Sequence, residues 1–89
     1  MRAVITVIGK DNVGILAKVS GVCANLNANV TDVTQSVLDD MFAMIMLADI
    51  TNMNADFSVL ADTMTELGKK LGLAIHTMHE DIFTAMHGI

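Results

Sequence analysis

The chain opens on an apolar run that lacks helical periodicity. Residues 3–8 are Ala-Val-Ile-Thr-Val-Ile, and their many β-branched side chains predict a strand that is buried on at least one face. After a polar turn, apolar residues recur with the spacing of a single helix face. They are Ile15, Leu16, Val19, Val22, Cys23 and Leu26. This spacing predicts a helix from about residue 14 to residue 26.

The middle of the chain has the pattern of two strands joined by a tight turn. Over residues 33–38, valine and glutamine side chains alternate with threonine, serine and leucine, which predicts an edge strand within residues 30–38. Asp39 and Asp40 interrupt this alternation and predict a chain reversal. Residues 41–50 are then apolar on both faces as far as Asp49, so we expect a central strand of the sheet.

The second half of the chain repeats this order of elements. We expect residues 51–56 to form a loop in which Asn54 or Asp56 accepts hydrogen bonds from the first N–H groups of a second helix. Two lysines followed by Gly72 predict where that helix ends. Its apolar face is formed by Phe57, Leu60, Ala61, Met64, Leu67 and Leu71. Residues 73–78 predict a fourth strand, and residues 80–89 predict a short helical tail.

The order β-α-β-β-α-β predicts an α+β, ferredoxin-like fold, in which a four-stranded antiparallel sheet carries two helices on one face. We expect residues 1–79 to form this domain. Residues 80–89 are expected to be a C-terminal helical tail that packs on the domain or on a partner subunit. The second face of the sheet then lacks cover, and 53% of the 89 residues are hydrophobic. A homo-oligomer, in the simplest case a dimer, is predicted to hide this surface.

Composition and charge narrow the classes of function. A formal net charge of -5 and only three aromatic residues leave neither a basic surface nor a stacking platform for direct nucleic-acid binding. The apolar runs are too short for a membrane span or a secretory signal. The single cysteine, Cys23, cannot form an internal disulfide and suits a reducing compartment. We therefore expect a soluble cytoplasmic protein.

Catalytic and metal-binding patterns are largely missing from the sequence. There is no nucleophile elbow, no phosphate-binding loop and no visible nucleophile–base pair, so we expect neither an enzyme nor a cofactor. Cys23 shares its helix face with apolar residues and is interpreted as a small buried hydrophobe. His76, His79 and His87 are close in sequence, but the first two point to opposite faces of a strand. We therefore expect no metal, and a histidine-based metal sensor is kept as an alternative.

The candidate binding site is the turn at residues 9–16, Gly-Lys-Asp-Asn-Val-Gly-Ile-Leu. A strand that turns sharply into a helix presents unpaired N–H groups and the positive end of the helix dipole, which favour a small anion such as a carboxylate. A second interpretation is purely structural. Asp11 and Asn12 then cap the helix, Gly14 permits the turn, and Asn29 supplies a turn with positive φ. The sequence leaves both interpretations open.

The same turn, together with Asn29 and Val30 at the entry to the second strand, resembles the ACT domain. This family consists of small regulatory modules that sense amino acids in metabolic enzymes and transcriptional regulators. The resemblance spans residues 1 to about 79. The total length and the tail, with Glu-Asp-Ile-Phe at residues 80–83, are similar to small stand-alone members related to the glycine cleavage system transcriptional repressor.

The resemblance implies a non-catalytic module, usually dimeric, that binds a small amino acid of the glycine or serine class at or near the subunit interface. The implied ligand-binding residues are Asp11, Asn12, Gly14, Ile15, Leu16 and Asn29. N–H groups at the start of the helix would hold the carboxylate. The two polar turn residues would meet the amino group, and the asparagine of the second strand would add another contact. Occupancy would be signalled through the homodimer to a protein partner, so that any effect on transcription is indirect.

The alternative from another class is a ligand-free interaction or oligomerisation module. In that case the open sheet face and the tail would dock partners, and Phe83 and Met86 in the tail would matter more than the turn at residues 9–16.

Overall fold

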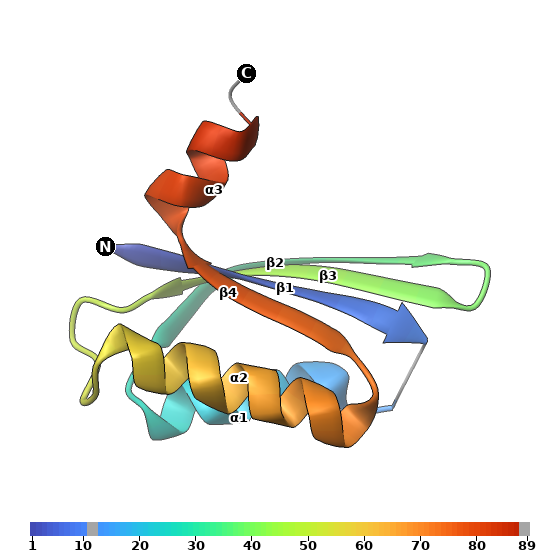
Figure 1. Cartoon of the computed structure of the whole chain (residues 1–89), viewed down its shortest axis with the longest axis horizontal. Helices are drawn as coiled ribbons and strands as arrows, with labels where there is room; N and C mark the ends of the chain where they lie inside the picture. Colours follow the sequence, from blue (N-terminus) through green and yellow to red (C-terminus); the bar gives the residue numbers. More distant parts are fainter. Residues whose placement is uncertain (11–12, 88–89) are drawn as a thin grey trace.

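The computed structural model describes residues 1–10 and 13–87, except for the side chain of residue 87. It confirms the predicted ferredoxin-like order of elements and the helical tail (Figure 1). The elements are β1 (Arg2–Lys10), α1 (Ile15–Asn25), β2 (Asn29–Leu38), β3 (Met41–Asp49), α2 (Phe57–Leu71), β4 (Ala74–His79) and α3 (Glu80–His87). The predicted bounds therefore hold to within a few residues.

The four strands form one antiparallel sheet in the order β2-β3-β1-β4. This confirms the prediction that β2 is an edge strand and that β3 is central. Directly paired residues point to the same face of a sheet. The pairing of Val33 with Met46 and of Thr34 with Ile45 therefore assigns the two faces of β2 and β3. Thr31 forms a bulge, because Val30 pairs with Ala48 while Asp32 pairs with the adjacent Leu47.

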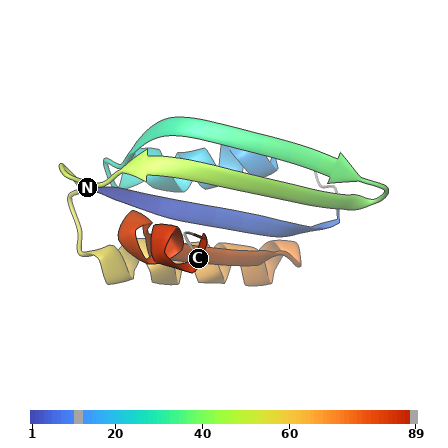
Figure 2. The same cartoon turned by 90° about the horizontal axis from the view of Figure 1, so that it is seen from above.

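Helices α1 and α2 cover one face of the sheet and enclose the core (Figures 1 and 2). The largest fully buried side chains include Ile5 from β1, Met44 and Met46 from β3, and Leu60 and Met64 from α2. Methionine therefore fills the core at positions 44 and 46. Met41 lies beside the β2–β3 turn and stays 46% exposed.

The prediction for the end of α2 is confirmed, whereas the prediction for its start is wrong. Gly72 has a φ of 69° and ends the helix in the left-handed conformation, as predicted. Asp56 occupies the position before the first helical residue, but its side chain makes no capping hydrogen bond. Asn54 does not cap either: its Nδ2 donates to the backbone oxygen of Asn25 at 3.3 Å. The capping prediction is wrong because this loop is held against the end of α1.

The tail helix α3 packs on the domain itself, one of the two positions expected for residues 80–89, and it lies on the second sheet face. It rises from that face at the end where the N-terminus lies (Figure 1), above β1 and β4 (Figure 2). The Arg2 guanidinium donates two hydrogen bonds to the Glu80 carboxylate and ties the helix to β1. Val4 points to this face yet has no exposed surface. The tail therefore covers one end of the second face and leaves the rest open.

Candidate functional site

The turn from β1 to α1 is built around Gly14, which precedes the first residue of the helix. Its φ of 83° is in the left-handed region, where a side chain is strained. A Cβ atom added there would meet nothing within 4 Å among the described residues. The glycine is therefore required by the backbone conformation and not by close packing. This confirms the structural half of the prediction for Gly14.

The next two residues of the turn have different surroundings. Ile15 is buried in the core at 2% exposure, whereas Leu16 is 38% exposed. The Ile15 side chain therefore anchors the first turn of α1 on the sheet. The first N–H groups of the helix have no intrahelical acceptors. The backbone oxygen of Gly14 accepts the first helical hydrogen bond, from the N–H of Lys18 at 3.0 Å. Asp11 and Asn12 lie outside the described residues.

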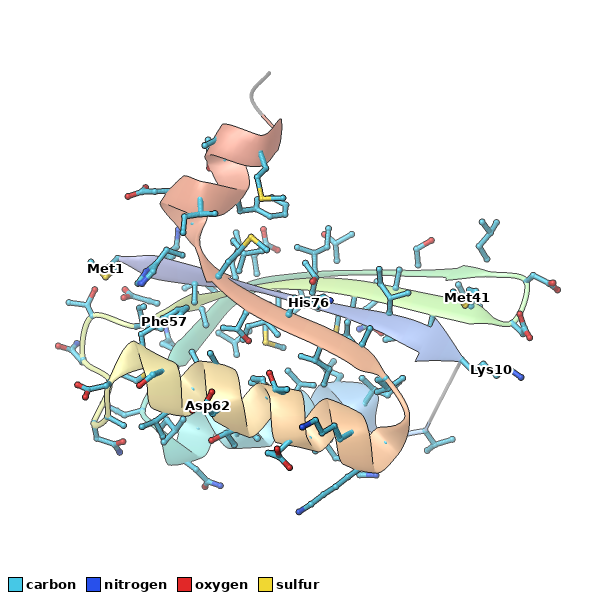
Figure 3. All side chains as sticks on the ribbon, viewed as in Figure 1. Met1, Lys10, Met41, Phe57, Asp62 and His76 are labelled. Atoms are coloured by element: carbon cyan, nitrogen blue, oxygen red, sulfur yellow. The ribbon has the colours of Figure 1, made fainter. Side chains whose placement is uncertain are left out.

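Charged residues of both signs lie at this end of the molecule, because the β2–β3 turn with Asp39 and Asp40 is next to Lys10. Lys10 ends β1 at the opposite end of the sheet from Met1 (Figure 3), and Lys18 is one turn into α1. Since Ile8 pairs with Ala74, the end of α2, with its two lysines, lies at the same end of the sheet. The first turn of α1 contains no acidic residue. The positive end of the helix dipole and the absence of an acidic residue from the first turn favour an anionic group near the start of α1, while Lys69 is already ion-paired with Glu66.

Asn29 lies at the other end of α1. The helix runs back along the sheet from Gly14, and β2 begins with Asn29 only after the helix has ended. Eleven helical residues span roughly 16 Å at a rise of about 1.5 Å each. Within one chain, the structure therefore does not bring Asn29 together with Gly14, Ile15 and Leu16. The structural interpretation of Asn29 as a positive-φ turn residue is wrong, because Asn27 takes that conformation, with a φ of 60°.

A surface cavity of about 400 Å³ lies beside Asn29, between the second half of α1 and the start of β2. Sequence reasoning did not single out two of its polar lining residues. Ser20 donates to the backbone oxygen of Leu16 at 2.6 Å, and the side-chain nitrogen of Asn27 donates to the backbone oxygen of Asn52 at 2.8 Å. Ser20 and Ala24, four residues apart on one side of α1, followed by the Asn27–Asn29 turn cluster, are the signal that could have found this cavity.

The groups that could support catalysis or metal binding are dispersed. Cys23 is fully buried, and burial raises the pKa of its thiol, so the prediction of a core residue is confirmed. His76 is exposed on one face of β4, while His79 lies on the other and stacks on Phe57 with ring centroids 4.0 Å apart. Within residues 1–10 and 13–87, no group of three histidine, cysteine or acidic residues is placed to hold a metal ion.

A second, smaller cavity of about 150 Å³ lies at the base of α3. It is lined by Met1, Arg2, His79, Glu80 and Asp81, and the Arg2–Glu80 ion pair occupies its wall. None of the described helices is both long and apolar enough to cross a membrane.

The fold and the turn together define a small ferredoxin-like domain with an anion-favouring helix start. Residues 2–78 match the model of the ACT domain family. A UPF0237 protein from Methanocaldococcus jannaschii is 47% identical over 88 residues, which are 99% of this chain and 98% of that protein. Another from Listeria innocua is 48% identical over 87 residues, or 98% of each chain.

Solved structures agree with this match. An ACT domain protein from Streptococcus pneumoniae superposes with a TM-score of 0.80 at 38% identity, covering 93% of each chain. A putative glycine cleavage system transcriptional repressor has a TM-score of 0.70 at 22% identity and shows the same fold. That alignment covers 86% of this chain and 44% of the other. The chain belongs to the ACT domain family, a class of regulatory modules that bind small ligands.

Proposed function

We propose that this protein is a non-catalytic regulatory module that binds a small amino acid, of the glycine or serine class, at the start of α1. The observation that carries the proposal is the glycine-initiated helix end, which is flanked by lysines and has no acidic residue in its first turn. N–H groups of Gly14, Ile15 and Leu16 hold the ligand carboxylate, and Asp11 and Asn12 meet its amino group.

The position of Asn29 makes this a two-subunit site. A small amino acid cannot span the roughly 16 Å that separates the two ends of α1. If Asn29 contacts the same ligand as Gly14, the two residues must belong to different chains. The proposed module is therefore a homodimer in which the ligand lies at the subunit interface.

The edge strand β2 offers a route to such a dimer. It runs antiparallel to α1, so that Asn29 and Gly14 lie at opposite ends of one helix–strand pair. Antiparallel pairing of β2 with β2 of a second copy brings the start of one strand beside the end of the other. Asn29 of one subunit then approaches Gly14 of its partner. A ligand that bridges them binds the dimer better than the separate chains and shifts the equilibrium toward the dimer.

A thermal-shift screen of the twenty amino acids tests ligand binding. A ligand at 100 times its dissociation constant adds about 2.7 kcal/mol of stability, which for a domain of this size is a shift on the order of 10 °C. Asn29→Ala should abolish the shift, whereas Asn25→Ala, an exposed asparagine in the last turn of α1, should leave it intact. The proposal fails if no amino acid stabilises the wild-type protein.

Mixing two inactive variants tests the two-subunit site. Asp11→Ala and Asn29→Ala each break every site in their own homodimer. In a mixed dimer, one site receives both substitutions and the other receives none, so about a quarter of all sites recover after subunit exchange. Calorimetric titration measures this fraction. A site contained in one chain would recover nothing on mixing.

The output of the module is proposed to be contact with another cytoplasmic protein. The chain's charge of -5 argues against direct contact with nucleic acid. Any effect on transcription therefore passes through the partner.

A further inference from the structure

The second face of the sheet, opposite α1 and α2, presents an apolar surface that the proposed amino-acid site does not use. We call it the open face, and its central residues on β1 and β3 are Val4, Thr6, Ile8, Ala43, Ile45 and Leu47. Ile8 is 47% exposed and Ile45 is 42% exposed. An antiparallel sheet that faces water normally carries polar residues on that side. The composition of the open face is instead that of a surface in contact with protein.

Helix α3 adds a second apolar surface beside the open face. Ile82 and Met86 lie four residues apart on one side of the helix, and they are 53% and 59% exposed. An eight-residue helix is only marginally stable in water unless tertiary packing supports it. Only β1 and β4 of its own chain contact it substantially, at one end of the open face (Figure 2). Ile82 and Met86 therefore present apolar surface that β1 and β4 leave uncovered.

We propose that the open face binds a second copy of this chain, and that α3 of each copy packs on the uncovered part of the other copy's open face. A two-fold interface requires one continuous patch that is complementary to itself. The chain supplies both parts of such a patch, namely a projecting apolar helix and an apolar sheet surface next to it (Figure 1).

The distribution of charge favours a copy of the chain as the occupant. The chain carries a net charge of -5, yet the six central residues of the open face are all uncharged. Two copies, which both carry a net negative charge, can therefore meet there without placing like charges against each other at the centre of the interface. On this face Lys10 lies at one end of β1, and at the other end Arg2, which is ion-paired with Glu80, lies opposite Asp49 on β3. Two copies with opposite strand directions bring each lysine toward the partner's Arg2–Glu80 ion pair and Asp49, where acidic groups outnumber the single arginine, and bring α3 toward the partner's Ile8.

The size of the surface is sufficient for a stable interface. Strands of nine, ten, nine and six residues give a flat area of about 550 Å², of which α3 of the same chain covers one end, and the exposed side of α3 adds about 100 Å². Because side chains project from the plane of the sheet, the solvent-accessible area is larger than this flat estimate. The result is close to the roughly 800 Å² per partner of a standard protein–protein interface.

This interface is independent of the amino-acid site, because it lies on the other side of the sheet from α1. If β2 pairing and open-face pairing both occur, the protein is a tetramer with dihedral symmetry. If only the open face pairs, it is a dimer. In either case, disruption of the open face halves the mass of the assembly.

Analytical ultracentrifugation of the full chain over a dilution series measures this change. Ile45→Glu and, separately, Met86→Glu should each halve the mass at micromolar concentration. The matched control is Val59→Glu on α2, which places the same charge at a side chain that is 43% exposed on the helical layer. Circular dichroism establishes that each variant is folded. A wild-type monomer, or an unchanged mass in both folded variants, overturns the proposal and leaves the open face to a different protein.

Disulfide trapping tests the position of α3. Ile8→Cys protein is mixed with Met86→Cys protein and oxidised, while buried Cys23 is protected from reaction. Packing of α3 on the partner predicts that the mixture gives a cross-linked species containing one chain of each kind. Absence of this species in a mixture that sedimentation shows to be oligomeric overturns the assignment of α3. Amino-acid binding is measured separately by thermal shift. If no amino acid binds, the proposed function fails, but the conclusions about the open face do not change.

Discussion

Two helical glycines should respond in opposite directions to the same substitution. Gly21 in α1 has open space where a Cβ atom would be, with nothing within 4 Å among the described residues. Gly68 in α2 is buried, and a Cβ there would lie 2.7 Å from the backbone oxygen of Leu73 and 3.2 Å from a side-chain carbon of Ile75. Leu73 N–H also donates to the oxygen of Gly68 at 2.9 Å, so this backbone cannot move freely.

The magnitudes follow from helix propensity and steric overlap. Alanine in place of glycine in a helix interior gains about 0.8–1 kcal/mol. Gly21→Ala receives this gain without an opposing cost, so its free energy of unfolding should rise by about 0.5–1 kcal/mol. Gly68→Ala receives the same gain but overpacks the α2–β4 contact, which costs about 1–3 kcal/mol. Its free energy of unfolding should therefore fall by about 1 kcal/mol.

Thermal and urea unfolding at one fixed protein concentration measure both effects, since the proposed oligomerisation would make the melting temperature depend on concentration. Each kcal/mol corresponds to about 4–8 °C for a domain of this size. The two variants should thus differ by on the order of 10 °C. An equal increase in melting temperature for both variants would refute the argument that the Leu73 backbone limits the space at Gly68.

Further predictions concern the turn, the core and two titrating groups. Gly14→Ala should cost about 1 kcal/mol by equilibrium unfolding, because its φ of 83° strains any side chain. Met46→Ala should cost about 2–5 kcal/mol in the same assay, because the side chain is fully buried. Cys23 should react with a thiol reagent far more slowly in the folded protein than in urea, since burial raises its pKa. Hydrogen bonds from Thr51 hold the pKa of the Asp49 carboxyl below its usual range, so Thr51→Ala should raise that pKa in an NMR titration.

Periodicity predicted the order of elements because each one has a strong local signal. The alternation around Val33 and the apolar run ending at Asp49 identify edge and central strands without reference to tertiary contacts. Gly72 likewise predicts the end of α2, because few residues other than glycine adopt its backbone conformation readily. These features depend on short stretches of sequence.

The features that sequence reasoning missed depend on contacts between distant segments. Asn54 has the residue type of a helix cap, but it is held against Asn25, which is 29 residues away. The side of the sheet taken by α3 is set in part by the ion pair of Arg2 with Glu80, 78 residues apart. The separation of Gly14 from Asn29 depends on the direction of α1 across the sheet. A residue list alone could place both at one site, whereas the fold does not do so within one chain.

The long edge strand β2 has a consequence for the handling of this protein. Its ten residues include one charged side chain, Asp32, and neither lysine nor proline. Natural sheets use charges, prolines and bulges to keep exposed edges from pairing indiscriminately, and here only Asp32 and the bulge at Thr31 serve that purpose. If β2 pairs with a second copy as proposed, variants that prevent this pairing should precipitate as β-rich aggregates while each domain is still folded. Loss of solubility would then be the first sign of a disrupted assembly.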